Sequence, residues 1–202
     1  MTIHFDLEKI RNEHNCSNYF ETGLWDPRTN VSSKLALSSG FKHVYCIELR
    51  DEWVQLGKQI FESEINNGRY HLIQDDSANM EIYLNQYSEV FLEKTVFFLD
   101  AHVDNPHIYN YKKKCPLLEE LEAIKNLKRK DNVILIDDLR IIKNSQITGP
   151  WGEKSYANIN MLEKIKEIIL SIDHNYKFTT LHGHVEDDVL MAYIPYIPNV
   201  HV

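Results

Sequence analysis

Several features that mark other protein classes are missing from this sequence of 202 residues. Acidic residues outnumber basic ones, and the formal net charge of −8 argues against a broad surface for the phosphate backbone of nucleic acid. The basic cluster Lys112 to Lys114 is short and predicts a solvated loop. No apolar stretch approaches the length that crosses a bilayer, so we expect no membrane partner.

Cysteine is scarce, and its pattern excludes a disulfide framework. Cys16, Cys46 and Cys115 are odd in number and lack the spacing of metal ligands. Cys46 lies in an apolar segment and is expected to be a small core residue. The first residues, Met1 to Asp6, lack the basic start and apolar run of a signal peptide. Together these features predict a soluble protein in a reduced, cytoplasmic setting.

The glycine-rich motif GxGxxG of dinucleotide-binding proteins is also absent. A predicted strand is followed by Glu21-Thr-Gly23, but Asp26 to Arg28 stand where a second glycine would be expected. A dinucleotide needs close approach of the backbone at several positions. A nucleotide-dependent oxidoreductase is therefore disfavoured, and a smaller cofactor without phosphates fits better.

The sequence does contain an alternation of strand-like and helix-like segments along nearly the whole chain. Five strand–helix units followed by a hairpin with a turn at Gly183 to Asp188 predict a doubly wound α/β fold. No linker or repeat divides residues 1–202, so we expect a single domain. The expected strands are 18–22, 43–49, 70–74, 95–99, 132–136, 176–181 and 189–194. The expected helices are 6–15, 31–39, one capped by Asp51, 77–87, one beginning at Pro116, and 158–171, with a long loop between 136 and 158.

Carboxylates lie at the carboxyl ends of four of these strands. They are Glu21, Glu48, Asp100 and the pair Asp137 and Asp138. In open α/β sheets, ligands bind just beyond the carboxyl ends of the strands. Carboxylates gathered there suit ribose hydroxyls, an ammonium group or a metal ion, which points to an enzyme with a nucleotide-type cofactor.

The residues after the second and third strands suit a nucleoside. A carboxylate at Glu48 can accept two hydrogen bonds from a ribose, although a helix-capping acid is the alternative. Asp76 and Ser77 can hold the exocyclic amine and a ring nitrogen of adenine. Equally, either residue can cap the helix that follows.

The remaining acids suit a cation. Asp100, Asp137 and Asp138 would repel one another unless a cation or a proton lies among them. Oxygen ligands of this kind suit magnesium, or calcium or manganese, whereas strand-end capping is the structural alternative. His102 can act as a general base near neutral pH, and a loop histidine with a satisfied hydrogen bond is its alternative.

Taken together, these segments resemble class I S-adenosylmethionine-dependent methyltransferases, from about Asn18 to Pro195. The resemblance implies a Rossmann-like sheet of seven strands in the order 3-2-1-4-5-7-6, with strand 7 antiparallel. It lies in the segments Tyr19-Phe-Glu-Thr-Gly23, Leu35 to Phe41, Val44 to Glu48, Phe98-Leu-Asp-Ala-His102, Cys115 to Leu121 and Ile134 to Asp138, which are similar to a small group found in bacteria and large viruses.

The resemblance also implies roles for single residues. Glu21 and Gly23 would line the methionine end of S-adenosylmethionine, Glu48 would bind its ribose, and Asp76 and Ser77 its adenine. Asp100 would lie beside the methionine portion and the acceptor. By similarity to magnesium-dependent O-methyltransferases, a magnesium ion would be held by Asp100, Asp137 and Asp138, and His102 would take the proton of a small hydroxylated or glycan-like acceptor.

The first loop departs from the family pattern. The segment Trp25 to Val31 is longer than usual and lacks the second glycine. The opposing hypothesis is therefore a non-catalytic member of the same fold, retained as a binding or assembly protein.

Overall fold

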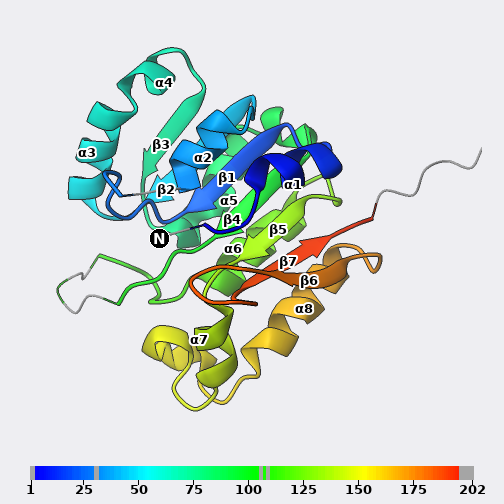
Figure 1. Cartoon of the computed structure of the whole chain (residues 1–202). Coiled ribbons are helices and arrows are strands. Elements are labelled where there is room, and N and C mark those ends of the chain that lie inside the picture. Colours follow the sequence, from blue (N-terminus) through cyan, green and yellow to red (C-terminus); the bar gives the residue numbers. More distant parts are fainter. Residues whose placement is uncertain (1–2, 30–31, 105–106, 108–109, 196–202) are drawn as a thin grey trace, which may run out of the picture.

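A seven-stranded sheet is the centre of the computed structural model, which describes residues 3–29, 32–104, 107 and 110–195. The strands are β1 (Asn18–Thr22), β2 (His43–Glu48), β3 (Tyr70–Gln74), β4 (Thr95–Leu99), β5 (Val133–Ile136), β6 (Lys177–Leu181) and β7 (Val189–Tyr193). Their order is β3-β2-β1-β4-β5-β7-β6, and β7 runs antiparallel to both of its neighbours (Figure 1). The predicted strand order and the direction of β7 are confirmed.

The central strands are buried on both faces because helices cover the sheet from both sides. Every residue of β1, β4 and β5 is buried. Side chains alternate between faces, so Phe20 packs in one core and its neighbour Tyr19 in the other. Continuous apolar runs such as 95–99 are therefore the expected sequence of buried parallel strands.

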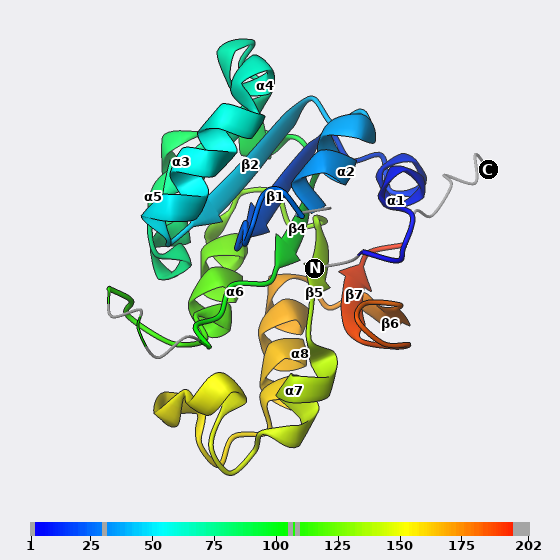
Figure 2. The same cartoon turned by 60° about the vertical axis from the view of Figure 1, so that its left-hand side comes forward.

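Two layers of helices enclose the sheet (Figures 1 and 2). Residues of α5, α6 and α8 pack in the core with Phe20, and residues of α1 and α2 pack in the core with Tyr19. None of the helices in the described part of the chain has the length and apolarity to span a bilayer. The helices are α1 (Leu7–Glu13), α2 (Ser32–Ser38), α3 (Asp51–Ile60), α4 (Glu62–Asn66), α5 (Met80–Gln86), α6 (Leu117–Asn126), α7 (Leu139–Asn144) and α8 (Met161–Ile172).

Two local predictions are wrong. The expected loop after β5 contains α7, and two short 3₁₀ turns follow it at Pro150–Gly152 and Lys154–Tyr156. Asp51 does not cap α3, because Arg50 holds the cap position and Asp51 is the first helical residue. There its charge still favours the helix dipole. The predicted start of the second helix at Val31 lies outside the described residues.

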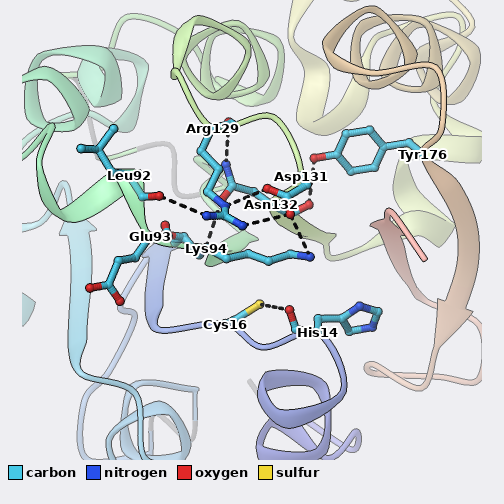
Figure 3. Close-up of polar contacts among 10 residues, drawn as sticks. His14, Cys16, Leu92, Glu93, Lys94, Arg129, Asp131, Asn132 and Tyr176 are labelled. Atoms are coloured by element: carbon cyan, nitrogen blue, oxygen red, sulfur yellow. Dashed lines mark hydrogen bonds and ion pairs between the residues drawn. The ribbon is translucent and has the colours of Figure 1, made fainter. Parts of the chain in front are cut away.

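At the amino edge of the sheet, ion pairs connect the residues that precede β4 and β5 (Figure 3). Arg129 Nε lies 2.7 Å from Asp131 Oδ1, and Lys94 Nζ lies 3.4 Å from Asp131 Oδ2. Arg129 also donates to the carbonyl of Leu92. These contacts link the start of β4 to the start of β5.

Candidate active site

A cavity of about 290 Å³ lies at the carboxyl edge of the sheet. In Figures 1 and 2, the loop after β4 and helix α7 both lie on this side of the molecule. Eight of the nine predicted site residues line the cavity, and Glu21 is the exception. The lining residues among them are Gly23, Glu48, Asp76, Ser77, Asp100, His102, Asp137 and Asp138.

Gly23 is required where β1 meets β4. Its φ is +89°, and an added Cβ would lie 3.1 Å from the carbonyl oxygen of Asp100. The backbone of the first loop therefore passes close to the end of β4, which only glycine permits without strain. Two residues later, Trp25 takes φ +57°, a left-handed conformation that is unusual for a bulky residue.

Glu48 holds this loop in place. One carboxylate oxygen accepts hydrogen bonds from the backbone amides of Leu24 and Trp25, at 2.8 and 3.0 Å. The other accepts from the amide of Arg50 at 2.7 Å. Burial raises the pKa of Glu48, and the three amide bonds oppose that rise. The carboxylate thus organises the loop that passes over the cavity as well as facing the cavity itself.

Asp76 and Ser77 begin the short 3₁₀ turn Ser77–Asn79. Asp76 Oδ1 accepts from the amide of Ala78 at 2.9 Å, so the capping alternative is realised. Its second oxygen accepts from the amide of Lys112 at 2.5 Å and ties the loop after β4 to this corner. Both residues are buried and also line the cavity, so capping and ligand contact are compatible here.

Glu21 lies behind the cavity rather than in its lining. Its carboxyl group is fully buried, where the hydroxyl of Ser33 donates to it and that of Tyr19 donates at 3.2 Å. Burial raises its pKa. The Glu21 side chain therefore packs between β1 and α2, outside the lining of the cavity.

Asp100, Asp137 and Asp138, at the ends of β4 and β5, line the same cavity, but the close groups of ligand atoms place Asp100 with Asp138 and His102, and Asp137 with Asp138 and Asp188. Burial, reinforced by the charges of Asp137 and Asp138, raises the pKa of Asp100 well above its usual range. Burial also raises the pKa of Asp137 to about 6. One oxygen of Asp100 is buried without a hydrogen-bond partner among the described residues. A group of like charges with an unsatisfied oxygen is the environment that a cation or a proton relieves.

His102 stands over this acidic group. Its Nδ1 lies 3.9 Å from Asp138 Oδ2, too far for a hydrogen bond, and finds no other partner in the described structure. Burial lowers the pKa of His102, and the charge of Asp138 opposes the change. The neutral imidazole that results at pH 7 can accept a proton.

Two residues beside the acids were missed in the sequence. Asp188 is buried at the start of β7, and Arg140 in α7 pairs with both Asp188 and Asp138. The position of Asp188 could have been predicted from the sequence. An antiparallel strand begins at the edge where its parallel neighbours end, so an acid just before the last strand lies at the same edge as the other acids. Arg140 carried no comparable signal, since α7 itself was not predicted.

The structure favours one set of ligand atoms for a metal ion over another. Atoms of Asp100, His102 and Asp138 lie within 4.8 Å of one another, as do atoms of Asp137, Asp138 and Asp188. In the second set Arg140 pairs with both Asp138 and Asp188, whereas in the first set it pairs only with Asp138, through Oδ1, and Asp138 Oδ2 lies toward His102. The first set contains the unpartnered oxygen of Asp100 and the unpartnered Nδ1 of His102. The donors therefore fit a divalent cation placed between Asp100 and Asp138, with His102 at its margin.

Comparison with known proteins identifies the fold. No protein-family model matches the chain, and no curated protein sequence matches it. Solved structures do match. An O-methyltransferase from Bacillus cereus in complex with SAH (S-adenosylhomocysteine) has a TM-score of 0.56 at 15% identity, covering 93% of this chain and 78% of its own.

Two further structures have the same architecture. A candidate caffeoyl-CoA O-methyltransferase from Staphylococcus aureus gives a TM-score of 0.56 at 14% identity over 93% of this chain and 80% of its own. The MycE methyltransferase of the mycinamycin biosynthetic pathway, in complex with Mg, SAH and mycinamycin VI, gives 0.54 at 17% identity over 95% of this chain and 49% of its own. At these identities the likeness establishes the class I methyltransferase fold.

Proposed function

We propose that this protein is an S-adenosylmethionine-dependent methyltransferase that methylates a hydroxyl group of a small hydroxylated or glycan-like acceptor with the help of magnesium. The observation that carries the proposal is the position of the acids. In a sheet with the methyltransferase strand order, Glu48 and Ser77 line one part of the carboxyl-edge cavity, and the acidic group with His102 lines another. Neighbours of the same fold are described with S-adenosylhomocysteine and, in one case, magnesium.

The roles divide along the cavity. Gly23 lets the backbone approach the methionine portion of the cofactor, with Glu21 behind it, Glu48 faces the ribose, and Asp76 with Ser77 faces the adenine. Asp100 lies between this end and the acceptor end. S-Adenosylmethionine, when bound, supplies the electrophilic methyl group, so the protein's contribution is positioning and electrostatics.

At the acceptor end, Asp100 and Asp138 would hold magnesium, and Asp137 lies beside them. Magnesium there would lower the pKa of an acceptor hydroxyl. His102, kept neutral by burial, takes the hydroxyl proton.

The first test is calorimetric titration of the protein with S-adenosylhomocysteine, with and without magnesium. Saturable one-site binding is expected in the wild type and should be lost in Glu48→Ala. Because Glu48 also binds three loop amides, Glu48→Gln is the sharper variant: it keeps an acceptor oxygen for the loop but removes the charge. Lys58→Ala, on the exposed side of α3, is the matched control.

A second candidate is a non-catalytic member of this fold that binds or assembles with a partner. Two observations favour it. Trp25 in the first loop has a left-handed backbone conformation, and both carboxylate oxygens of Glu48 already accept hydrogen bonds from backbone amides. Under this alternative the wild type shows no heat of binding with S-adenosylhomocysteine under either condition.

A further inference from the structure

The loop after α7 contains an aromatic residue placed directly against the candidate base. The rings of Trp151 and His102 are stacked, with centroids 4.2 Å apart and planes at 13°. His102 lines the main cavity. Trp151 does not; it lines a separate small cavity behind it and packs against the hydrophobic core. The indole therefore covers the back of the imidazole, on the side away from the main cavity.

The backbone that presents Trp151 is strained. Trp151 has φ +51° and ψ +20°, a left-handed conformation that is unfavourable for a bulky residue. The preceding Gly149 has φ +73°, and an added Cβ there would lie 2.0 Å from the carbonyl oxygen of Glu153. The turn thus has little freedom, and the contacts of the indole must compensate for its strain.

The same turn is anchored to its surroundings on two sides. Glu153 Oε2 accepts a hydrogen bond of 2.8 Å from the amide of Lys114, at the end of the loop that carries His102. Tyr156 donates to Glu119 of α6 at 2.7 Å. The first bond joins the two long loops that border the acceptor end, and the second joins the turn to α6, so both restrict the position of the indole relative to the imidazole.

The side-chain contacts described for His102 leave one of its ring nitrogens unsupported. Its Nδ1 is 3.9 Å from Asp138 and has no hydrogen-bond partner in the part of the chain described. Hydrogen bonds usually set the orientation of a histidine ring at an active site. Here the flat stack sets the plane of the ring.

We propose that Trp151 is a positioning residue that holds the imidazole of His102 in the plane where it meets the acceptor hydroxyl. The inference rests on the proposed methyltransferase function. It assigns to the loop after α7 a role in the rate of transfer, distinct from binding the cofactor or the acceptor.

The test compares Trp151→Phe and Trp151→Leu with Ile147→Ala, a control at an exposed position of the same loop. In Trp151→Leu we expect kcat for methylation of catechol, used as a small hydroxylated acceptor, to fall about 100-fold with little change in KM, the scale of a misplaced reacting group. Trp151→Phe, which keeps a flat ring, should recover most of the rate. Affinity for S-adenosylhomocysteine should stay at the wild-type value in all three variants.

A spectroscopic measurement separates this inference from the proposed function. The NMR resonances of the His102 ring are assigned in histidine-labelled protein by their loss in His102→Gln. The stacked aromatic ring should shift these resonances in the wild type and in Trp151→Phe. The shift should be absent in Trp151→Leu. Absence of S-adenosylhomocysteine binding in the wild type would reject the function and leave the stack measurable. A Trp151→Leu protein with wild-type kcat, or with raised KM at constant kcat, would overturn the positioning role. If that variant does not fold, Trp151→Met, which also lacks a flat ring, decides by the same outcomes.

Discussion

Among single residues, Glu120 stands out as a buried acid outside the proposed chemistry. It lies in the first turn of α6 with 1% of its surface exposed, and neither carboxyl oxygen has a hydrogen-bond partner of good geometry among the described residues. Burial raises its pKa to about 7, against a smaller opposing effect of the Ser77 and Thr22 hydroxyls. An acid with a raised pKa in the folded state binds its proton more tightly there than in the unfolded chain. It therefore destabilises the fold as pH rises from about 4.5 to about 7.

We expect Glu120→Gln to remove this penalty. Its free energy of unfolding should match the wild type near pH 4 and exceed it by about 3 kcal/mol above pH 8, the value that corresponds to the pKa shift. Urea denaturation followed at several pH values measures the difference. Glu122→Gln, an exposed change in the same helix, is the control. A difference that does not grow with pH would mean that Glu120 is already satisfied by water or by a ligand.

At the scale of elements, α7 depends on a strand far away in the sequence. Asp138 precedes the helix in a left-handed conformation (φ +57°) and makes no side-chain cap. Asp188 supplies the missing acceptors instead, because its side chain binds the amide of Arg140 at 2.9 Å and its carbonyl binds the amide of Leu139 at 2.8 Å. The start of the six-residue helix is thus held by Asp188, at the end of the turn between β6 and β7, and a local sequence pattern contains no sign of it.

Removing this acceptor should unravel the start of α7. For Asp188→Ala we expect a loss of about 2 kcal/mol in stability, between the effect of a lost helix cap and that of a broken buried ion pair, since Arg140 is partly exposed. Hydrogen exchange at the amides of Ile141 and Ile142 should accelerate. Glu186→Ala, in the exposed turn of the same hairpin, is the matched change. Unchanged exchange in α7 would show that the helix forms without Asp188.

For the whole molecule, the sequence was sufficient wherever the sheet itself determines position. Strands β1, β3 and β4 begin and end at the predicted residues, and the acids at the strand ends meet because parallel strands share one carboxyl edge. What could not be predicted depends on contacts between distant segments. Arg140 reaches the acids through α7, and Trp151 reaches His102 through a strained loop, so neither pairing leaves a periodic or spaced pattern in the sequence.

The acidic edge should also couple the stability of the whole molecule to divalent cations. Asp100 and Asp138 face each other with His102, and the raised pKa values of Asp100 and Asp137 show the cost of keeping these charges together. A cation that binds only the folded state stabilises it by about 2.7 kcal/mol at a concentration of 100 Kd. For a chain of this length that corresponds to a rise in Tm of roughly 5–10 °C.

Scanning calorimetry in magnesium chloride measures the rise at pH 7.5, and potassium chloride at equal ionic strength controls for screening. Asp138→Asn should abolish the dependence on magnesium, because it removes a charged ligand while keeping the shape of the side chain. If Asp138→Asn shows the full magnesium-dependent rise, the cation binds elsewhere, and Asp100 and Asp138 are strand-end acids without a metal.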